Sequence, residues 1–179
     1  MRLFIGLPLH DDLKKNLQDA WQPFAEKFKY RAIPPELWHM TIAFLDDVPE
    51  QKLPALAELI GSALKTTPSG IWTFTRFETF PAKKLANITA HAEPENSEAW
   101  KKFIDSLRDV VSLVAPGIDR KPWHPHVTIG KAPKNARLPA WNEGIEPLVW
   151  QPDILALVHS TLTAQGPIYR HSHEFKLRV

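Results

Sequence analysis

The sequence predicts an α+β fold of two similar lobes, and three observations lead to this prediction. Short apolar runs of the kind found in strands alternate with longer segments whose apolar residues recur at helical spacing. The strand-like segment His39–Ile42, of sequence His-Met-Thr-Ile, returns as His126–Ile129, of sequence His-Val-Thr-Ile. No low-complexity tract or linker divides the chain. We therefore expect one domain over residues 1–179, in which two largely antiparallel sheets face a central cleft with helices outside.

The elements before the first motif follow from alternation and capping. Arg2–Leu9 alternates as a strand does, and Asp11 or Asp12 suits the N-cap of a helix running to about Phe28. A short strand is expected at Tyr30–Ile33, before a pair of prolines. The apolar stripe of the helix consists of Leu13, Leu17, Ala20, Trp21 and Phe24.

The middle of the chain begins with the apolar run Trp38–Leu45, a strand that contains the first motif. A second helix is predicted over Gln51–Lys65, with Pro54 in its first turn, where proline is tolerated. Aromatic residues and threonines alternate through Ile71–Phe80, which predicts a strand, and Leu85–Ala92 is its expected partner.

The remaining elements continue the same alternation. Asn96 or Ser97 suits the cap of a third helix that runs to about Val114. Pro122–Lys131 is predicted as the strand that carries the second motif, whereas Arg137–Pro147 supports no prediction. The last two strands are expected at Ile154–Thr163 and Tyr169–Leu177, joined by a turn at Ala164–Pro167.

Composition excludes several classes of function. The chain has 44% apolar and 23% charged residues, a formal net charge of +2, and no apolar run long enough to span a bilayer. Without cysteine there is no disulfide, thiol nucleophile or cysteine-based zinc site, which fits a cytoplasmic location. Seventeen prolines against seven glycines, with no Gly-rich fingerprint, argue against a glycine-rich phosphate loop. Any preference for phosphate must therefore come from local placement of charge.

The duplicated motif supplies the chemistry. Side chains at i and i+2 of a strand share a face, so each copy presents an imidazole beside a hydroxyl. Two such strands facing each other bring His39, His126, Thr41 and Thr128 around one cavity. One neutral imidazole can accept a proton while a protonated one donates a proton, and the threonines can hydrogen-bond to phosphate oxygens. The sequence thus predicts acid–base chemistry on a phosphate.

Three segments carry a resemblance to a known family. Ile33–Leu45 resembles the first signature of the 2H phosphoesterase superfamily, and more narrowly of the LigT-like RNA 2′,3′-cyclic phosphodiesterases, also called 2′-5′ RNA ligases. Pro125–Lys131 resembles the second signature, and Ser160–Tyr169 resembles the family's characteristic end. The first strand and helix also match in placement, so the resemblance covers nearly the whole chain.

The resemblance implies a duplicated bilobal fold and metal-independent opening of an RNA-terminal 2′,3′-cyclic phosphate to a 2′-phosphate, with no cofactor. Some relatives run a reverse-type reaction that joins RNA ends through a 2′-5′ bond. By analogy His39 is the general acid and His126 the base. The family often has arginine where this chain has Lys131, which we expect to contact phosphate without the bidentate guanidinium.

Four aromatic residues are candidates for contact with a base or for the rim of the cleft. Trp38 and Trp123 precede the two motifs, and Tyr169 follows the family-like end. Aromatic stacking commonly holds single-stranded RNA ends. Phe44 lies five residues after His39, so regular alternation turns it to the opposite face and favours core packing over stacking on a base.

Several alternatives remain open. One alternative keeps the chemistry but replaces RNA with a small substrate, such as a cyclic nucleotide, an ADP-ribose cyclic phosphate or a 2′-5′-linked oligonucleotide. A second is a module that binds RNA ends without turnover. A third is a zinc hydrolase that uses His124 and His126, or the pair His171 and His173, with Asp153, Glu174 or His159 available as further ligands. The favoured interpretation is a monomeric enzyme acting on RNA ends or small cyclic-phosphate nucleotides, without metal or membrane.

Overall fold

The computed structural model describes residues 1–164 and 166–177. Over these residues the α+β class is confirmed, with nine strands and three α-helices. The strands are β1 (Arg2–Pro8), β2 (Arg31–Ala32), β3 (His39–Asp47), β4 (Trp72–Phe80), β5 (Asn87–Pro94), β6 (His126–Lys131), β7 (Asn142–Trp150), β8 (Ile154–Thr163) and β9 (Gly166–Lys176). The helices are α1 (Asp11–Trp21), α2 (Leu53–Ala63) and α3 (Ser97–Ser112).

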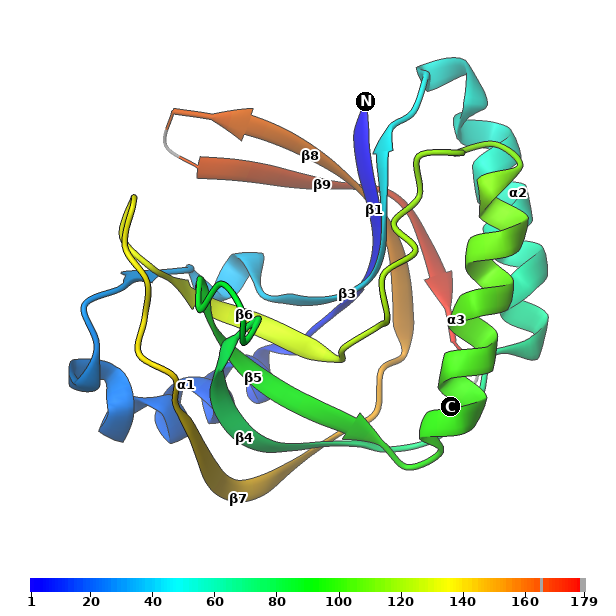
Figure 1. Cartoon of the computed structure of the whole chain (residues 1–179). Coiled ribbons are helices and arrows are strands. Elements are labelled where there is room, and N and C mark those ends of the chain that lie inside the picture. The colour runs from blue at the N-terminus through cyan, green and yellow to red at the C-terminus, as the bar shows by residue number, and fades with distance from the viewer. Residues whose placement is uncertain (165, 178–179) are drawn as a thin grey trace.

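The strands form one antiparallel sheet across the described residues, in the order β7-β4-β5-β6-β3-β1-β8-β9, with β2 also paired to β6. The two motif strands, β3 and β6, are neighbours at its centre (Figure 1). They meet at a single residue pair, Met40 with Val127, both fully buried. The two predicted sheets are therefore two halves of one sheet, joined by this pair.

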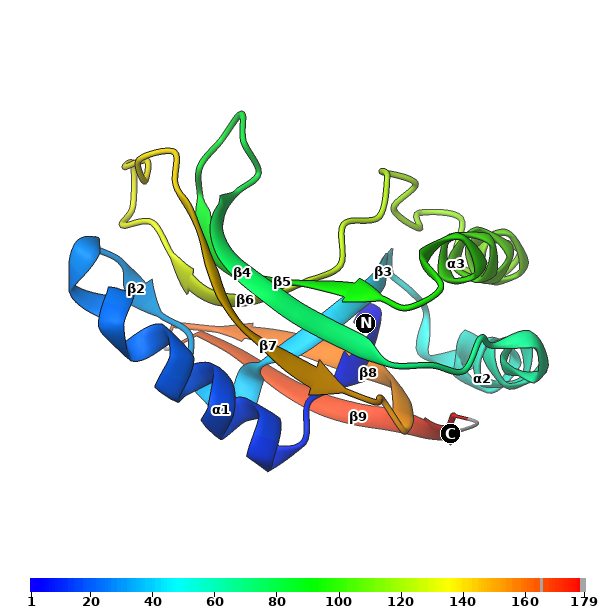
Figure 2. The same ribbon diagram turned by 90° about the horizontal axis from the view of Figure 1, so that it is seen from below.

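The helices cover the sheet at two separate places. Helices α2 and α3 pack side by side, and α1 lies along the opposite side of the molecule against β7 (Figures 1 and 2). The predicted cap of α3 is confirmed, because the Oδ1 of Asn96 accepts a hydrogen bond from the backbone N–H of Ala99 at 3.0 Å. The buried side chains of α3 are Trp100, Phe103, Ile104, Leu107, Arg108 and Val111.

Prolines account for several differences from the predicted boundaries. The first helix ends at Trp21 rather than at Phe28, and Gln22–Lys27 forms a 3₁₀ helix with Pro23 near its start. Proline lacks the N–H that an α-helix needs in its interior. Pro54 lies in the first turn of α2 as predicted, although 3₁₀ turns at Glu50–Lys52 and Leu64–Thr66 replace both predicted ends of this helix.

The strands also differ from prediction at their ends. The motif strands begin at the histidines themselves, because residues 35–37 form a 3₁₀ turn and residues 122–125 contain two prolines. Arg137–Pro147, over which no element was predicted, contributes most of β7, and this strand pairs with β4 at one edge of the sheet. The last strand starts at Gly166, and Gln165 of the predicted turn lies outside the described residues.

None of the helices within residues 1–164 and 166–177 has the length and apolar character needed to cross a bilayer.

Candidate active site

The two motifs have the same burial pattern in the two central strands. In β3 and in β6 the histidine and the threonine are half-buried, whereas the residue after each of them is buried. Each imidazole therefore shares a strand face with the hydroxyl two residues later, as the sequence predicted.

Both motif strands then contain a β-bulge at the same place. β3 slips by one residue against β1 at Ile42, and β6 slips by one residue against β5 at Ile129. A bulge adds one unpaired residue and reverses the alternation of faces beyond it. Accordingly the next residues, Ala43 and Gly130, are buried as well.

The bulges turn the fifth residue after each histidine back to the face of that histidine. These equivalent residues are Phe44 in β3 and Lys131 in β6. The expected core packing of Phe44 is therefore wrong, since its side chain is 50% exposed. The prediction failed because it assumed regular alternation through the whole strand.

A cavity of about 240 Å³ lies over these residues. Both histidines and both threonines of the motifs line it, although they come from opposite ends of the sequence. Phe44, Lys131 and Tyr169 line it too. The structure thus brings two imidazoles, two threonine hydroxyls and one ammonium group around a single space.

Each imidazole is oriented by a backbone carbonyl two residues before it. The Nδ1 of His39 donates a hydrogen bond to the oxygen of Leu37 at 2.8 Å, and the Nδ1 of His126 donates to the oxygen of His124 at 2.7 Å. A neutral ring whose Nδ1 carries the proton has its lone pair on Nε2. The two rings are therefore held as the same tautomer.

The environments of both rings favour the uncharged form. The His39 ring stacks on Phe4 with 4.6 Å between centroids and meets Tyr169 edge-on at 5.2 Å. Burial lowers the pKa of His39 to about 4. Burial also lowers the pKa of His126, whose ring lies 5.1 Å from that of Phe80.

The predicted aromatic contacts divide into three groups. Phe44 and Tyr169 line the central cavity. Trp123 lines an adjoining cavity of about 340 Å³, which shares Phe44 and His126 with the central one, and its Nε1 donates to the oxygen of Thr41 at 3.0 Å. Trp38 is buried in the core instead, where its Nε1 donates to a backbone carbonyl.

The predicted zinc ligands do not gather around His126. The carboxylate of Asp153 pairs with His10 and that of Glu174 pairs with His171, each at 2.6 Å. His124 points its Nε2 at Glu78 Oε1, 2.7 Å away. Among the described residues, one group of three metal-ligating side chains was found, formed by Glu78, His91 and His124.

The charges of this group depend on one another. Although burial alone would raise the pKa of Glu78, the hydrogen bond from His124 and the neighbouring positive charges hold it below its usual value. Burial, assisted by the charge of Arg76, lowers the pKa of His91.

Sequence reasoning missed the residues that support the histidines. Phe4 lies in the first strand and reaches His39 only through sheet pairing, because β1 is the neighbour of β3. Glu78 and His91 lie on two other strands, and no motif marks them. Only His124 carried a signal, as the first histidine of a His-Pro-His sequence.

Known proteins match this chain over nearly its whole length. The model of the 2′-5′ RNA ligase superfamily matches residues 10–163. A Thermotoga maritima protein and a Thermus thermophilus protein, both named RNA 2′,3′-cyclic phosphodiesterase, are each 28% identical. The alignments cover 97% of this chain and 94% of the first protein, and 99% of this chain and 91% of the second.

Two solved structures illustrate the agreement in fold. The crystal structure of the Thermus thermophilus protein TT0787 matches with a TM-score of 0.84 at 27% identity, covering 99% of this chain and 98% of that one. Apo LigT of Escherichia coli matches with a TM-score of 0.71 at 18% identity, covering 98% of this chain and 96% of that one, and shares the fold.

Proposed function

Because the chain belongs to the 2′-5′ RNA ligase superfamily, we propose that it hydrolyses the 2′,3′-cyclic phosphate at the end of an RNA to a 2′-phosphate. The observation that carries this proposal is the convergence of His39 and His126 on one cavity, each held by a carbonyl at Nδ1. Relatives whose alignments cover nearly the full length of the chain are named RNA 2′,3′-cyclic phosphodiesterase, which supports the proposal.

The proposed reaction needs one base and one acid. The Nε2 of His126 takes a proton from water as the water oxygen attacks phosphorus. The bond from phosphorus to the 3′ oxygen breaks, and His39 delivers a proton to that oxygen, so the phosphate stays on the 2′ oxygen. Bound phosphate carries a negative charge, which raises the pKa of an adjacent imidazole. His39, uncharged in the free protein, thus takes up its proton as substrate binds.

The other residues around the cavity are proposed to bind substrate. Thr41 and Thr128 donate hydrogen bonds to the non-bridging oxygens, where negative charge accumulates in the transition state. Lys131 supplies a positive charge, and Phe44 and Tyr169 offer aromatic surfaces for the terminal base. Trp123 is proposed to contact the next nucleotide in the adjoining cavity.

No step of this reaction requires a metal ion, because the imidazoles move the protons and the hydroxyls and Lys131 meet the phosphate charge. We propose that the enzyme acts as a monomer in the cytoplasm, since one chain supplies every residue of the cavity and contains no cysteine. Turnover is therefore expected to persist in the presence of a chelator.

The proposal is tested with an RNA oligomer that ends in a 2′,3′-cyclic phosphate. We expect His39→Ala and His126→Ala each to lower kcat by about 10²–10⁴-fold, the usual contribution of a general acid or base. His173→Ala, which changes an exposed histidine on β9, is the matched control and should keep the wild-type rate. Near wild-type turnover by both active-site variants would rule the mechanism out.

The position of the phosphate in the product shows which phosphorus–oxygen bond of the substrate breaks. Phosphorus retained on the 2′ hydroxyl supports the assignment, whereas a 3′-phosphate would keep the paired histidines but exchange the leaving group. Comparing the oligomer with a mononucleotide 2′,3′-cyclic phosphate separates an enzyme for RNA ends from one for small nucleotides. Tight binding of the oligomer without product would indicate a binding module instead.

A further inference from the structure

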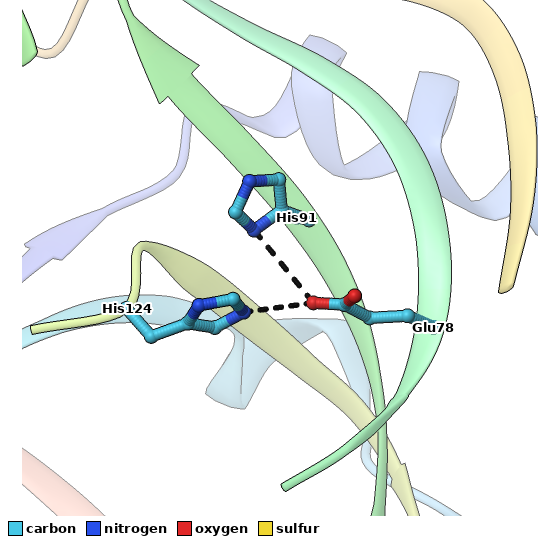
Figure 3. Close-up of side chains that lie close together, drawn as sticks. All are labelled: Glu78, His91 and His124. Atoms are coloured by element: carbon cyan, nitrogen blue, oxygen red, sulfur yellow. Dashed lines mark hydrogen bonds and ion pairs between the residues drawn. The ribbon is translucent and has the colours of Figure 1, made fainter. Parts of the chain in front are cut away.

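A second cluster of titratable side chains lies beside the cleft, outside the proposed reaction. Glu78 comes from β4, His91 from β5, and His124 from the segment before β6 (Figure 3). Each offers one ligand atom, and the three atoms lie within 4.8 Å of one another. Because β4, β5 and β6 are consecutive in the sheet, the backbone itself holds the three residues together.

Within this cluster, His91 has a ring nitrogen that hydrogen bonding leaves unsatisfied. Its side chain is 8% exposed, and its buried Nδ1 has no hydrogen-bond partner. This nitrogen faces Glu78 Oε1 at 3.7 Å, which is beyond hydrogen-bonding distance. A buried polar atom without a partner is uncommon and calls for an explanation, such as an ion that binds there.

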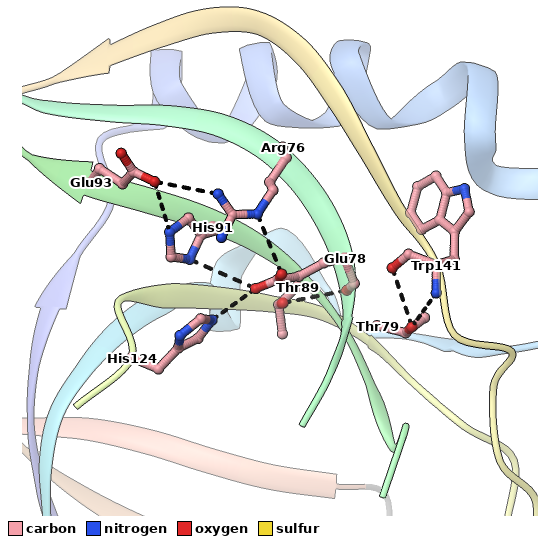
Figure 4. A network of polar contacts seen from close by, with 8 residues as sticks. All are labelled: Arg76, Glu78, Thr79, Thr89, His91, Glu93, His124 and Trp141. Atoms are coloured by element: carbon pink, nitrogen blue, oxygen red, sulfur yellow. Dashed lines mark hydrogen bonds and ion pairs between the residues drawn. The ribbon is translucent and has the colours of Figure 1, made fainter. Parts of the chain in front are cut away.

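The surroundings of the cluster resemble the outer partners of a metal site. The other ring nitrogen of His91, Nε2, lies 3.3 Å from Glu93 Oε1. Arg76 holds the second oxygen of Glu78 and also contacts Glu93, both at 3.3 Å (Figure 4). Metal-binding histidines commonly have a carboxylate on the far nitrogen. With neutral imidazoles, the two carboxylates and one guanidinium leave a net negative charge, which suits a cation.

We propose that Glu78, His91 and His124 bind one zinc ion. Two imidazoles and one carboxylate are a ligand set that zinc uses in proteins, with water at the remaining position. Binding through the Nε2 of His124 needs the lone pair of that nitrogen, so the neutral ring of His124 would carry its proton on Nδ1 and Glu78 would accept the ion in place of the hydrogen bond. The ion would fasten residues 122–125, which have no regular structure, to β4 and β5.

This site is separate from the reacting groups. The Nδ1 of His126 donates a hydrogen bond to the backbone oxygen of His124. An ion bound to His124 would therefore help to position His126 and would not contact the phosphate. The inference therefore does not depend on the proposed hydrolysis, and its test measures metal and not turnover.

The test titrates zinc chloride into full-length protein that has been freed of metal, by calorimetry and by elemental analysis after desalting. We expect one zinc per chain. Glu78→Gln and His91→Gln are each expected to weaken zinc binding by at least about tenfold. X-ray absorption of the wild-type complex should show only nitrogen and oxygen ligands, at about 2.0–2.2 Å.

Two control variants establish where the ion binds. His173→Gln removes an exposed histidine elsewhere, and His39→Ala removes one imidazole from the cleft, so both proteins should bind zinc as the wild type does. Loss of zinc from His39→Ala would place the ion in the cleft and overturn the inference. Absence of zinc from the wild type would also overturn the inference. Wild-type zinc affinity in both Glu78→Gln and His91→Gln would overturn it as well. Circular dichroism shows whether each variant is folded. If His91→Gln does not fold, the zinc affinity of Glu78→Gln decides the test by itself.

Discussion

His39 is held on three sides by groups that leave only its Nε2 free. A carbonyl fixes Nδ1, Phe4 covers one face of the ring, and Tyr169 meets it edge-on. Burial of this kind disfavours the imidazolium, because a charged ring loses its hydration. The same groups therefore fix the orientation of the His39 ring and lower its basicity.

The His39 imidazole is expected to titrate with a pKa of about 4 in the free protein. Its depressed pKa means that the ring is uncharged at neutral pH and gains a proton only in acid. Phe4→Leu uncovers one face and should move the pKa upward, toward the ordinary value. Inorganic phosphate should also raise it. The chemical shift of the His39 ring proton, followed against pH by NMR, measures each change.

A pKa of His39 near its ordinary value in the free wild-type protein would contradict this account of burial. His173 is the internal reference, because its exposed ring lies on β9 away from the cavity. Its resonance should respond neither to Phe4→Leu nor to phosphate at the concentrations used.

The site residues could be predicted from sequence only where one segment contained the whole signal. The His-x-Thr pattern shows an imidazole beside a hydroxyl, and its repetition indicates two such strands. Phe4 and His91 could not be found in this way, since each reaches its partner through strand pairing between segments far apart in the chain. A single sequence does not specify that pairing.

At the scale of the elements, the two bulges shape the site. They shift Phe44 and Lys131 onto the cleft face, so each motif strand contributes three side chains instead of two. Bulges of this kind re-aim a side chain next to a functional site. Neither strand contains an unusual residue at Ile42 or Ile129 that would have revealed a bulge.

Directly after the bulge in β6, Gly130 packs against the ring of Tyr30. A Cβ on Gly130 would lie 2.5 Å from the Tyr30 ring, whose hydroxyl accepts a hydrogen bond from Trp21 Nε1 at 2.8 Å. Gly130→Ala therefore overpacks a buried position, and we expect it to lower the free energy of unfolding by about 1–3 kcal/mol. Urea denaturation of both proteins measures the difference.

Gly144→Ala in β7 is the matched control for this substitution. A Cβ there would have one neighbour, the Thr75 oxygen at 3.9 Å, so the stability should be nearly unchanged. Equal stability of the two variants would show that Tyr30 does not restrict this position.

Element types were more predictable than element ends. Alternation and helical spacing found every helix and nearly every strand, because burying one face imposes a period on the sequence. Prolines displaced the ends, as in the 3₁₀ helix Gln22–Lys27. β7 was missed because six of its nine residues are exposed, which leaves little apolar alternation to detect.

At the scale of the whole molecule, the two halves of the sheet meet at one backbone pair, and side chains reinforce the junction. The buried Arg108 of α3 donates hydrogen bonds to the oxygens of Ile42 and Lys121, at 3.4 and 3.1 Å. Trp123 adds a bond to Thr41. These two side chains tie β3 to the segment before β6.

Arg108→Met should therefore loosen the junction while keeping much of the buried volume. We expect the free energy of unfolding to fall by about 1–3 kcal/mol, because the carbonyls of Ile42 and Lys121 lose a partner and the first of them is buried. We also expect kcat to fall, since the two histidines lie on opposite sides of the junction. Denaturant unfolding and turnover of cyclic-phosphate RNA measure these effects.

Arg120→Met provides the comparison, because Arg120 is half-exposed and pairs with Asp109 at the surface. Exposed ion pairs contribute little, so stability and kcat should stay near the wild-type values. A loss equal to that of Arg108→Met would mean that the effect is one of charge and not of the junction.

The Met40–Val127 pair has a consequence for how activity is lost. One half of the sheet supplies the first imidazole and the other half supplies the second, so neither half contains a working set of groups. A small hinge movement at this junction would separate the rings of His39 and His126 without unfolding either half of the sheet. Catalysis is thus the first property that heat or pressure should remove, while both half-sheets still keep their hydrogen bonds.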